Sequence, residues 1–168
     1  FLSPAAFIPV FEKNGMIAQV DRHIWRQVCA ILAEWQRLGR DQFISVNISP
    51  KDFYFMDVAA ELKGLVAEHG IDPTRLRLEI TESVMISDID NKVRLLSSLR
   101  EAGFIVEMDD FGSGYSSLNM LKNMPIDVIK IDMVFLRDSG QDEKSRMILR
   151  NIINMSTDLN IVPLTEGV

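Results

Sequence analysis

Two adjacent aspartates, Asp109 and Asp110, stand at the end of the apolar run FIVEMDD and precede the glycine- and serine-rich segment FGSGYSSL. Neighbouring side chains of a regular strand point to opposite faces of a sheet, so two successive carboxylates do not both face one site. Two interpretations are open. Either the strand breaks into a loop here and both carboxylates turn inward, or one aspartate is only a turn residue.

Four other β-like runs also carry polar side chains at or near their carboxyl ends. These are Asn47 in FISVNIS, Glu79 in LRLEIT, Lys130 with Asp132 in DVIKID, and Glu166 in NIVPLTE. Apart from Lys130, the set offers only oxygen ligands, without cysteine or histidine, and hard cations such as Mg²⁺ or Mn²⁺ prefer such ligands. We therefore expect Asn47, Glu79, Asp109, Asp110 and Glu166 to be metal ligands.

A pair of adjacent aspartates suits a site with two ions, which is typical of phosphoryl displacement. Lys130 would reach into this acidic site, where an ammonium can orient a water molecule or stabilise charge on a phosphate. Asp132 would face the same side and hold the lysine. Taken singly, each residue has a simpler explanation as a turn residue, a buried ion pair or a solvated edge residue. For the set as a whole, however, such an explanation would have to hold independently at the carboxyl ends of all five strands, which favours a common site.

The elements that must position these residues are five predicted strands, at residues 43–49, 76–81, 104–110, 127–132 and 160–166. Helical periodicity separates them. The predicted helices run from an Asp21 cap to Gly39, from an Asp57 cap to Gly70, from Asp90 to Gly103, from Ser117 to about Lys122, and from about Asp142 to Leu159. In the first helix we expect Ile24, Val28, Ile31 or Leu32, and Trp35 to face the core.

This βα repeat predicts an α/β fold with a parallel sheet, either an open doubly wound sheet or a (β/α)8 barrel. Polar residues at every strand end favour the barrel, because barrel enzymes build their sites there. A barrel usually takes about 250 residues, and the chain has 168. We expect an incomplete barrel, with the first strand and the last strands absent. A complete smaller α/β domain is the alternative.

Composition narrows the function class. The net charge is −6 and the pI is near 4.9, which argues against binding a nucleic-acid polymer or an anionic membrane. No apolar run reaches the length of a membrane span. Cys29 is the single cysteine, and we expect a buried, inert thiol in a cytoplasmic domain, although a longer parent protein could be membrane-anchored. His23 and His69 lie in helix-like stretches, which disfavours a Ser-His-Asp hydrolase.

The order of several motifs resembles the EAL domain, a family of bacterial phosphodiesterases that hydrolyse cyclic di-GMP to linear pGpG. The motifs are FIP (7–9), NGMI (14–17), SVNIS (45–49), LEITES (78–83), DDFGSGYSSL (109–118), KID (130–132) and TEGV (165–168). The similarity covers nearly the whole chain. It implies a modified (β/α)8 barrel whose first strand is antiparallel to the others.

The resemblance also implies roles at matching positions. Asn47, Glu79 and Asp109 would hold a first Mg²⁺ or Mn²⁺ ion, and Asp109, Asp110 and Glu166 a second. Lys130, with Glu166, would be catalytic, Lys130 by contacting the attacking water. Glu82 would brace the loop 111–117, which in this family couples dimerisation to metal binding, so a homodimer is expected.

Some features depart from the family pattern. The Glu-Ala-Leu segment, expected just before Phe1, and a later glutamine are absent from the chain. KIDMVFL replaces a usual arginine-serine pair, Thr165 replaces alanine, and Glu107 replaces a small residue, which adds an unexplained charge near the site. The alternative function is a catalytically inactive EAL-like module that binds cyclic di-GMP or a partner protein; a weaker one is a barrel enzyme in which Mg²⁺ stabilises an enolate. We expect residues 1–168 alone to be inactive, since an incomplete barrel loses closure and a ligand.

Overall fold

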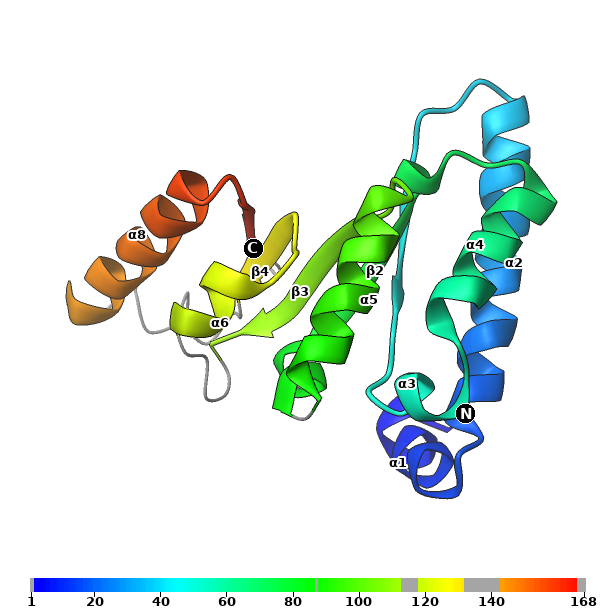
Figure 1. Cartoon of the computed structure of the whole chain (residues 1–168), viewed down its shortest axis with the longest axis horizontal. Coiled ribbons are helices and arrows are strands. Elements are labelled where there is room, and N and C mark those ends of the chain that lie inside the picture. The colour runs from blue at the N-terminus through cyan, green and yellow to red at the C-terminus, as the bar shows by residue number, and fades with distance from the viewer. Residues whose placement is uncertain (1, 87, 113–117, 132–142, 166–168) are drawn as a thin grey trace.

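The computed structural model describes residues 2–86, 88–112, 118–131 and 143–165. Its centre is a parallel sheet in which each strand pairs with the next one along the chain (Figure 1). The strands are β1 (Ile44–Asn47), β2 (Leu76–Thr81), β3 (Ile105–Phe111), β4 (Val128–Ile131) and β5 (Val162–Thr165). This sequential order is that of a singly wound, barrel-type sheet, because a doubly wound sheet reverses its order at a switch point.

Helices connect the strands, and α5 and α6 cross in front of β2 to β4 in Figure 1. The helices are α1 (Pro4–Asn14), α2 (Ile17–Arg37), α3 (Asp52–Phe55), α4 (Val58–His69), η1 (Pro73–Arg75), η2 (Glu82–Ile86), α5 (Ile89–Glu101), α6 (Leu118–Asn123) and α8 (Glu143–Asp158). Among the described residues, no helix is both long enough and apolar enough to cross a membrane.

Strand alternation divides the sheet into an apolar face under the helices and a polar face, which we call the inner face. On β2, Leu78 and Ile80 are fully buried, whereas Glu79 between them is only partly buried. The polar residues of the inner face on β1 to β4 are Ser45, Asn47, Arg77, Glu79, Thr81, Glu107, Asp109 and Lys130. The period-2 pattern thus places the predicted site residues of four neighbouring strands on one surface.

Local signals predict two helices well. The Oδ1 atom of Asp57 accepts a hydrogen bond from the N–H of Ala60 at 3.0 Å, which confirms the predicted cap of α4. Gly70 ends that helix with φ at 63°, a left-handed conformation that glycine adopts without strain. Helix α5 starts at Ile89, one residue before the predicted Asp90, and buries Leu96 and Leu99.

Helix α2 differs from its prediction. It begins at Ile17, so Asp21 lies inside the helix and is not its cap. The buried side chains include Asp21, Trp25 and Leu32, whereas Ile24 and Ile31 are 45% and 42% exposed. The prediction that Ile24 faces the core is therefore wrong, and of the two alternatives Ile31 and Leu32 it is Leu32 that faces the core. Val28 and Trp35 pack against the core as predicted.

Cys29 also lies on the buried side of α2. It is fully buried, and burial, with a smaller contribution from the charge of Glu68, raises the pKa of its thiol to about 11. The protonated form of a thiol is a poor nucleophile. This agrees with the expected buried, inert cysteine.

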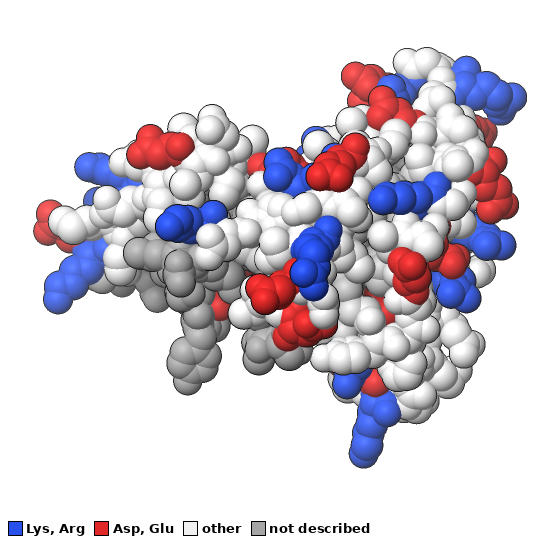
Figure 2. Space-filling view, in the orientation of Figure 1, with Lys and Arg blue, Asp and Glu red and all other residues white. Residues whose placement is uncertain are grey.

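The other end of the sheet is less covered. The spacing of Ile148, Ile152, Met155 and Leu159 predicts that they form a single apolar stripe. Ile152 and Met155 pack against the core, but Ile148 and Leu159 are exposed. On the helix side of the molecule, Figure 2 shows acidic and basic side chains interspersed over the described residues. A mixed surface of this kind does not form the broad basic patch that a nucleic-acid polymer requires.

Candidate active site

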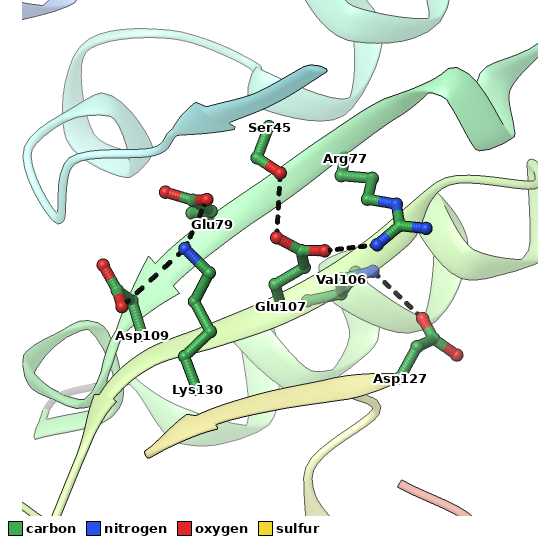
Figure 3. A network of polar contacts seen from close by, with 8 residues as sticks. All are labelled: Ser45, Arg77, Glu79, Val106, Glu107, Asp109, Asp127 and Lys130. Carbon is green, nitrogen blue, oxygen red and sulfur yellow. Dashed lines mark hydrogen bonds and ion pairs between the residues drawn. The ribbon is translucent and has the colours of Figure 1, made fainter. Parts of the chain in front are cut away.

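Three strands bring Glu79, Asp109 and Lys130 together on the inner face (Figure 3). The ammonium of Lys130 donates a hydrogen bond to Oε1 of Glu79 at 2.6 Å and lies 3.9 Å from Oδ1 of Asp109. The three side chains are 8%, 14% and 22% exposed for Lys130, Glu79 and Asp109. Such limited contact with water strengthens the attraction between an ammonium and two carboxylates.

Asp109 and Asp110 form a β-bulge. Met108 pairs with Ile129 and Phe111 pairs with Ile131, so three steps along β3 correspond to two steps along β4. The strand therefore does not break into a loop at the aspartates, as one interpretation expected, but accommodates one extra residue and continues to Phe111.

The backbone of Asp110 makes this bulge possible. Its φ is 54°, in the left-handed region that aspartate tolerates better than most residues. The N–H of Asp110 donates to Oδ1 of Asp109 at 3.0 Å, which fixes the orientation of the preceding carboxylate. Bulges commonly redirect side chains next to active sites, and this one lies at the two successive aspartates, where the register of β3 and β4 shifts.

Asn47 lies at the carboxyl end of β1, directly beside Glu79 in the register of the sheet. The indole N–H of Trp25 donates to the main-chain oxygen of Asn47 at 3.1 Å, and the N–H of Ile48 donates to the oxygen of Glu79 at 2.8 Å. Helix α2 and strand β2 therefore fix the backbone that presents the exposed side chain of Asn47.

Just beyond Asn47, two buried carboxyl groups connect α2 to α3. Asp52 is fully buried, and its Oδ2 accepts a hydrogen bond from the N–H of Ser49 at 2.8 Å. Burial raises the pKa of Asp52 to about 6, and burial together with the charge of Asp52 raises the pKa of Asp21 to about 7. Two adjacent buried carboxylates do not both ionise readily, so these pKa values favour one bound proton on the pair near neutral pH.

Sequence reasoning missed this pair. Asp21 has the type and position of a helix cap, and nothing near Asp52 in the sequence points to a partner 31 residues away. The one available signal is that the α2 stripe of buried residues, read with Trp25 and Leu32 in it, includes position 21.

Glu107 also lies on the inner face, and its charge, unexplained by the sequence, is balanced. It is 1% exposed, its Oε1 accepts from Nη1 of Arg77 at 3.0 Å, and its Oε2 accepts from the hydroxyl of Ser45 at 2.9 Å. The expectation from strand alternation that Glu107 shares a face with Asp109 is confirmed (Figure 3).

A family comparison identifies the chain, since the EAL domain model matches residues 1–168. The chain belongs to the EAL domain family. Among curated proteins, this EAL domain is 32% identical over 168 residues to the bifunctional diguanylate cyclase/cyclic di-GMP phosphodiesterase MucR of Pseudomonas aeruginosa. That match covers 99% of the chain and 24% of MucR. The chain spans 20 to 27% of the length of the first curated relatives that it matches.

Solved structures show the same relationship. The structure described as PaMucR phosphodiesterase in complex with c-di-GMP has a TM-score of 0.91 at 32% identity, covering 99% of this EAL domain and 68% of that chain. The manganese and cy-diGMP complex of Klebsiella pneumoniae BlrP1 has a TM-score of 0.78 at 30% identity, covering 90% and 38%. The likeness confirms the predicted barrel-type α/β fold, and the five strands described here do not close into a barrel.

Some of the predicted site residues lie outside the part of the chain that the structure describes. Glu166 and Asp132 lie outside the described residues, as does most of the loop 111–117 that Glu82 is expected to brace. Glu82 itself is the first residue of η2, directly after β2. The roles of these three residues stay predictions.

The oxygen donors of this EAL domain fit a hard cation. Asn47, Glu79, Asp109 and Asp110 lie at the ends of three neighbouring strands and include no soft ligand. Within the described ranges, no three Asp, Glu, His or Cys side chains are grouped closely enough to hold a metal ion, and the Lys130 ammonium lies beside two of the carboxylates. The chemistry of the donors, all of them oxygen atoms, suits Mg²⁺ or Mn²⁺.

Proposed function

We propose that this EAL domain is a metal-dependent phosphodiesterase that hydrolyses cyclic di-GMP to linear pGpG. The observation that carries the proposal is the Lys130, Glu79 and Asp109 cluster at the strand ends. Ammonium and carboxylates at that edge of a parallel barrel are typical of a catalytic site. The likeness to a solved phosphodiesterase complex with c-di-GMP supports the choice of substrate.

In this proposal, metal binding uses the residues predicted from the sequence. Asn47, Glu79 and Asp109 hold one Mg²⁺ or Mn²⁺ ion, while Asp109, Asp110 and Glu166 hold the other. Bound divalent ions would neutralise phosphate oxygens and lower the pKa of the attacking water. The hydrogen bond from the Asp110 N–H keeps the Asp109 carboxylate oriented for this role.

Lys130 is the proposed catalytic cation, acting together with Glu166. Its ammonium has three donors and already lies among the carboxylates that would face the substrate phosphate. There it can orient the attacking water and stabilise negative charge that develops on the phosphoryl oxygens. Asp132, two residues beyond Lys130, is the proposed anchor of this lysine.

The proposed ligand is a small anionic dinucleotide, not a nucleic-acid polymer or a membrane. The net charge of −6 opposes binding of a phosphate diester, so the metal ions and Lys130 must supply the local attraction. A cytoplasmic homodimer is the proposed form, consistent with where this family's second messenger is used. Residues 1–168 alone are expected to be inactive.

The test is an assay of the intact protein with cyclic di-GMP and either Mg²⁺ or Mn²⁺, with pGpG release followed by chromatography. Turnover that stops when the metal is chelated is the expected result. The Asp109→Asn variant is the negative control, because it retains the shape of the ligand and removes one charge. If folded, metal-loaded protein binds cyclic di-GMP in calorimetry without hydrolysing it, the inactive binding module is the correct function.

A further inference from the structure

Below the strand-end cluster, the inner face carries a second polar group formed by Ser45, Arg77 and Glu107, which we call the lower triad. Both carboxylate oxygens of Glu107 accept a hydrogen bond, Oε1 from Arg77 and Oε2 from Ser45. Figure 3 shows Glu107 drawn between the Lys130 ammonium and the Arg77 guanidinium. The lower triad therefore borders the proposed catalytic cluster on the same surface.

Arg77 is held in place from two sides. Its guanidinium carbon lies 3.3 Å from the centroid of the Phe43 ring, and its Nη1 is 3.0 Å from Oε1 of Glu107. Arginine stacks on aromatic rings through its planar face while its edge donates hydrogen bonds. This combination fixes the guanidinium beside Glu107.

Glu107 and Glu79 are direct neighbours in the register of β2 and β3. Like charges at opposed positions of a sheet repel each other, and the repulsion is greater when the groups are shielded from water. In this structure each carboxylate has its own cation, since Arg77 pairs with Glu107 and Lys130 pairs with Glu79. Each of these two neighbouring carboxylates therefore lies beside a cation on the inner face.

We propose that Arg77 and Glu107 are positioning residues that keep Lys130 on Glu79 and Asp109. Without Arg77, the buried carboxylate of Glu107 would need another cation, and Lys130 is the nearby one on the same face. Without Glu107, Arg77 would be drawn to Glu79, two residues along the same strand and on the same face. Either single loss misplaces the ammonium, whereas loss of both charges leaves it in place. The consequence for catalysis rests on the proposed function.

The test uses four forms of the intact protein: wild type, Arg77→Met, Glu107→Gln and the double variant. We expect Arg77→Met to lower kcat about tenfold to a hundredfold with KM for cyclic di-GMP little changed, as for other supporting residues around metal sites. The double variant is expected within about threefold of wild type, because buried partners removed together leave no unpaired charge. Arg77→Lys should recover part of the loss, since it keeps the charge.

Arg75→Met is the matched control. Arg75, the last residue of η1, is also an arginine in an ion pair, but its partner Asp41 is on the surface and belongs to neither inner-face group. A wild-type kcat in Arg75→Met would show that the loss of an arginine ion pair does not by itself lower kcat. Urea unfolding of each variant verifies that the comparison is between folded proteins.

A crystal structure of metal-free Arg77→Met tests the inference without any enzymatic readout, so failure of the proposed function leaves it testable. We expect Nζ of Lys130 within hydrogen-bond distance of Glu107 in that variant. Lys130 still bonded to Glu79 would overturn the inference. Wild-type kcat in folded Arg77→Met, or a double variant as slow as Arg77→Met, would overturn it as well.

Discussion

The inner face of the sheet and the contact between α2 and α3 both bring carboxyl groups together, and the two places neutralise them differently. On the inner face, the Lys130 ammonium balances Glu79 and Asp109. Between the helices, Asp21 and Asp52 have no lysine or arginine in ion-pair contact among the described residues, and their raised pKa values favour a bound proton near neutral pH.

The two places differ in whether another cation can replace the one that balances the carboxylates. An ammonium on a flexible side chain can move aside when a divalent ion arrives. Asp52 instead binds the segment that follows Asn47, since its Oδ2 accepts a hydrogen bond from the N–H of Ser49. The inner-face group is thus suited to ligand chemistry, and the helix pair to holding one of its proposed ligands in place.

The largest expected effect comes from removing the inner-face cation. Lys130→Met should lower kcat about a hundredfold to a thousandfold, the range for loss of one preorganised donor to a transition state. Its Mn²⁺ affinity should rise, because the ammonium no longer competes for Glu79 and Asp109. Steady-state kinetics and calorimetry with Mn²⁺ alone measure the two effects.

The control for that experiment is Lys122→Met, which removes an exposed lysine of α6 and should change neither quantity. A folded Lys130→Met protein with lower Mn²⁺ affinity would contradict the idea that Lys130 substitutes for a metal. It would instead make the lysine a structural part of the carboxylate group.

The next effect concerns the proton between Asp21 and Asp52. The folded pKa of Asp21 is raised to about 7 from 3.8, mainly by burial, then by Asp52 and, from α1, Glu12. The folded protein therefore binds a proton that the unfolded chain releases, so stability falls as pH rises from about 4 through about 7. In Asp21→Asn the neutral amide can donate to Asp52 at any pH without binding a proton. The free energy of unfolding of this variant should therefore exceed that of wild type at pH 8 by on the order of 2 kcal/mol.

Hydrogen exchange of the α2 and α3 amides in the intact protein, corrected for intrinsic exchange at each pH, measures this stability. Asp158→Asn, at an exposed carboxylate at the end of α8, should keep the wild-type pH dependence. An Asp21→Asn profile that falls with pH as steeply as wild type would show that the pair holds no shared proton.

The smallest expected effect tests the bulge that sets the inner-face carboxylates. At an ordinary strand position glycine is less stable than alanine, but Asp110 has φ at 54°. Asp110→Gly should therefore be more stable than Asp110→Ala by about 1 kcal/mol in metal-free buffer. At Thr81, in the regular strand β2, the same two substitutions should rank in the opposite order. Thermal unfolding of the four variants decides whether the sign reverses.

Much of this arrangement follows from short-range patterns. All five strands form where the β-like runs predict them, and alternation alone puts Glu79, Glu107 and Asp109 on one face. Parallel pairing then brings strand ends together, which is why side chains distant in sequence could be grouped in advance. The prediction of the Lys130 environment rests on the same geometry.

The features that sequence reasoning missed depend on partners far along the chain. Burial and the charge of Asp52 raise the pKa of Asp21, while Arg77 balances the charge of Glu107 and Ser45 donates it a hydrogen bond. The bulge at Asp109 and Asp110 depends on Phe111 pairing with Ile131. No periodicity within a single segment reports such contacts.

The bulge also changes the phase of β3. By simple alternation from Asp109, Phe111 would point to the inner face, yet it is 4% exposed and belongs to the hydrophobic core. The extra residue lets an aromatic ring enter the core while two carboxylates stay at the strand end. Deleting a single residue between Met108 and Phe111 would set these two demands against each other, since only one of them could be met in an unbulged strand. One-residue length variation here should therefore be tolerated far less than substitution, and a deletion scan of β3 would detect the site through folding yield alone.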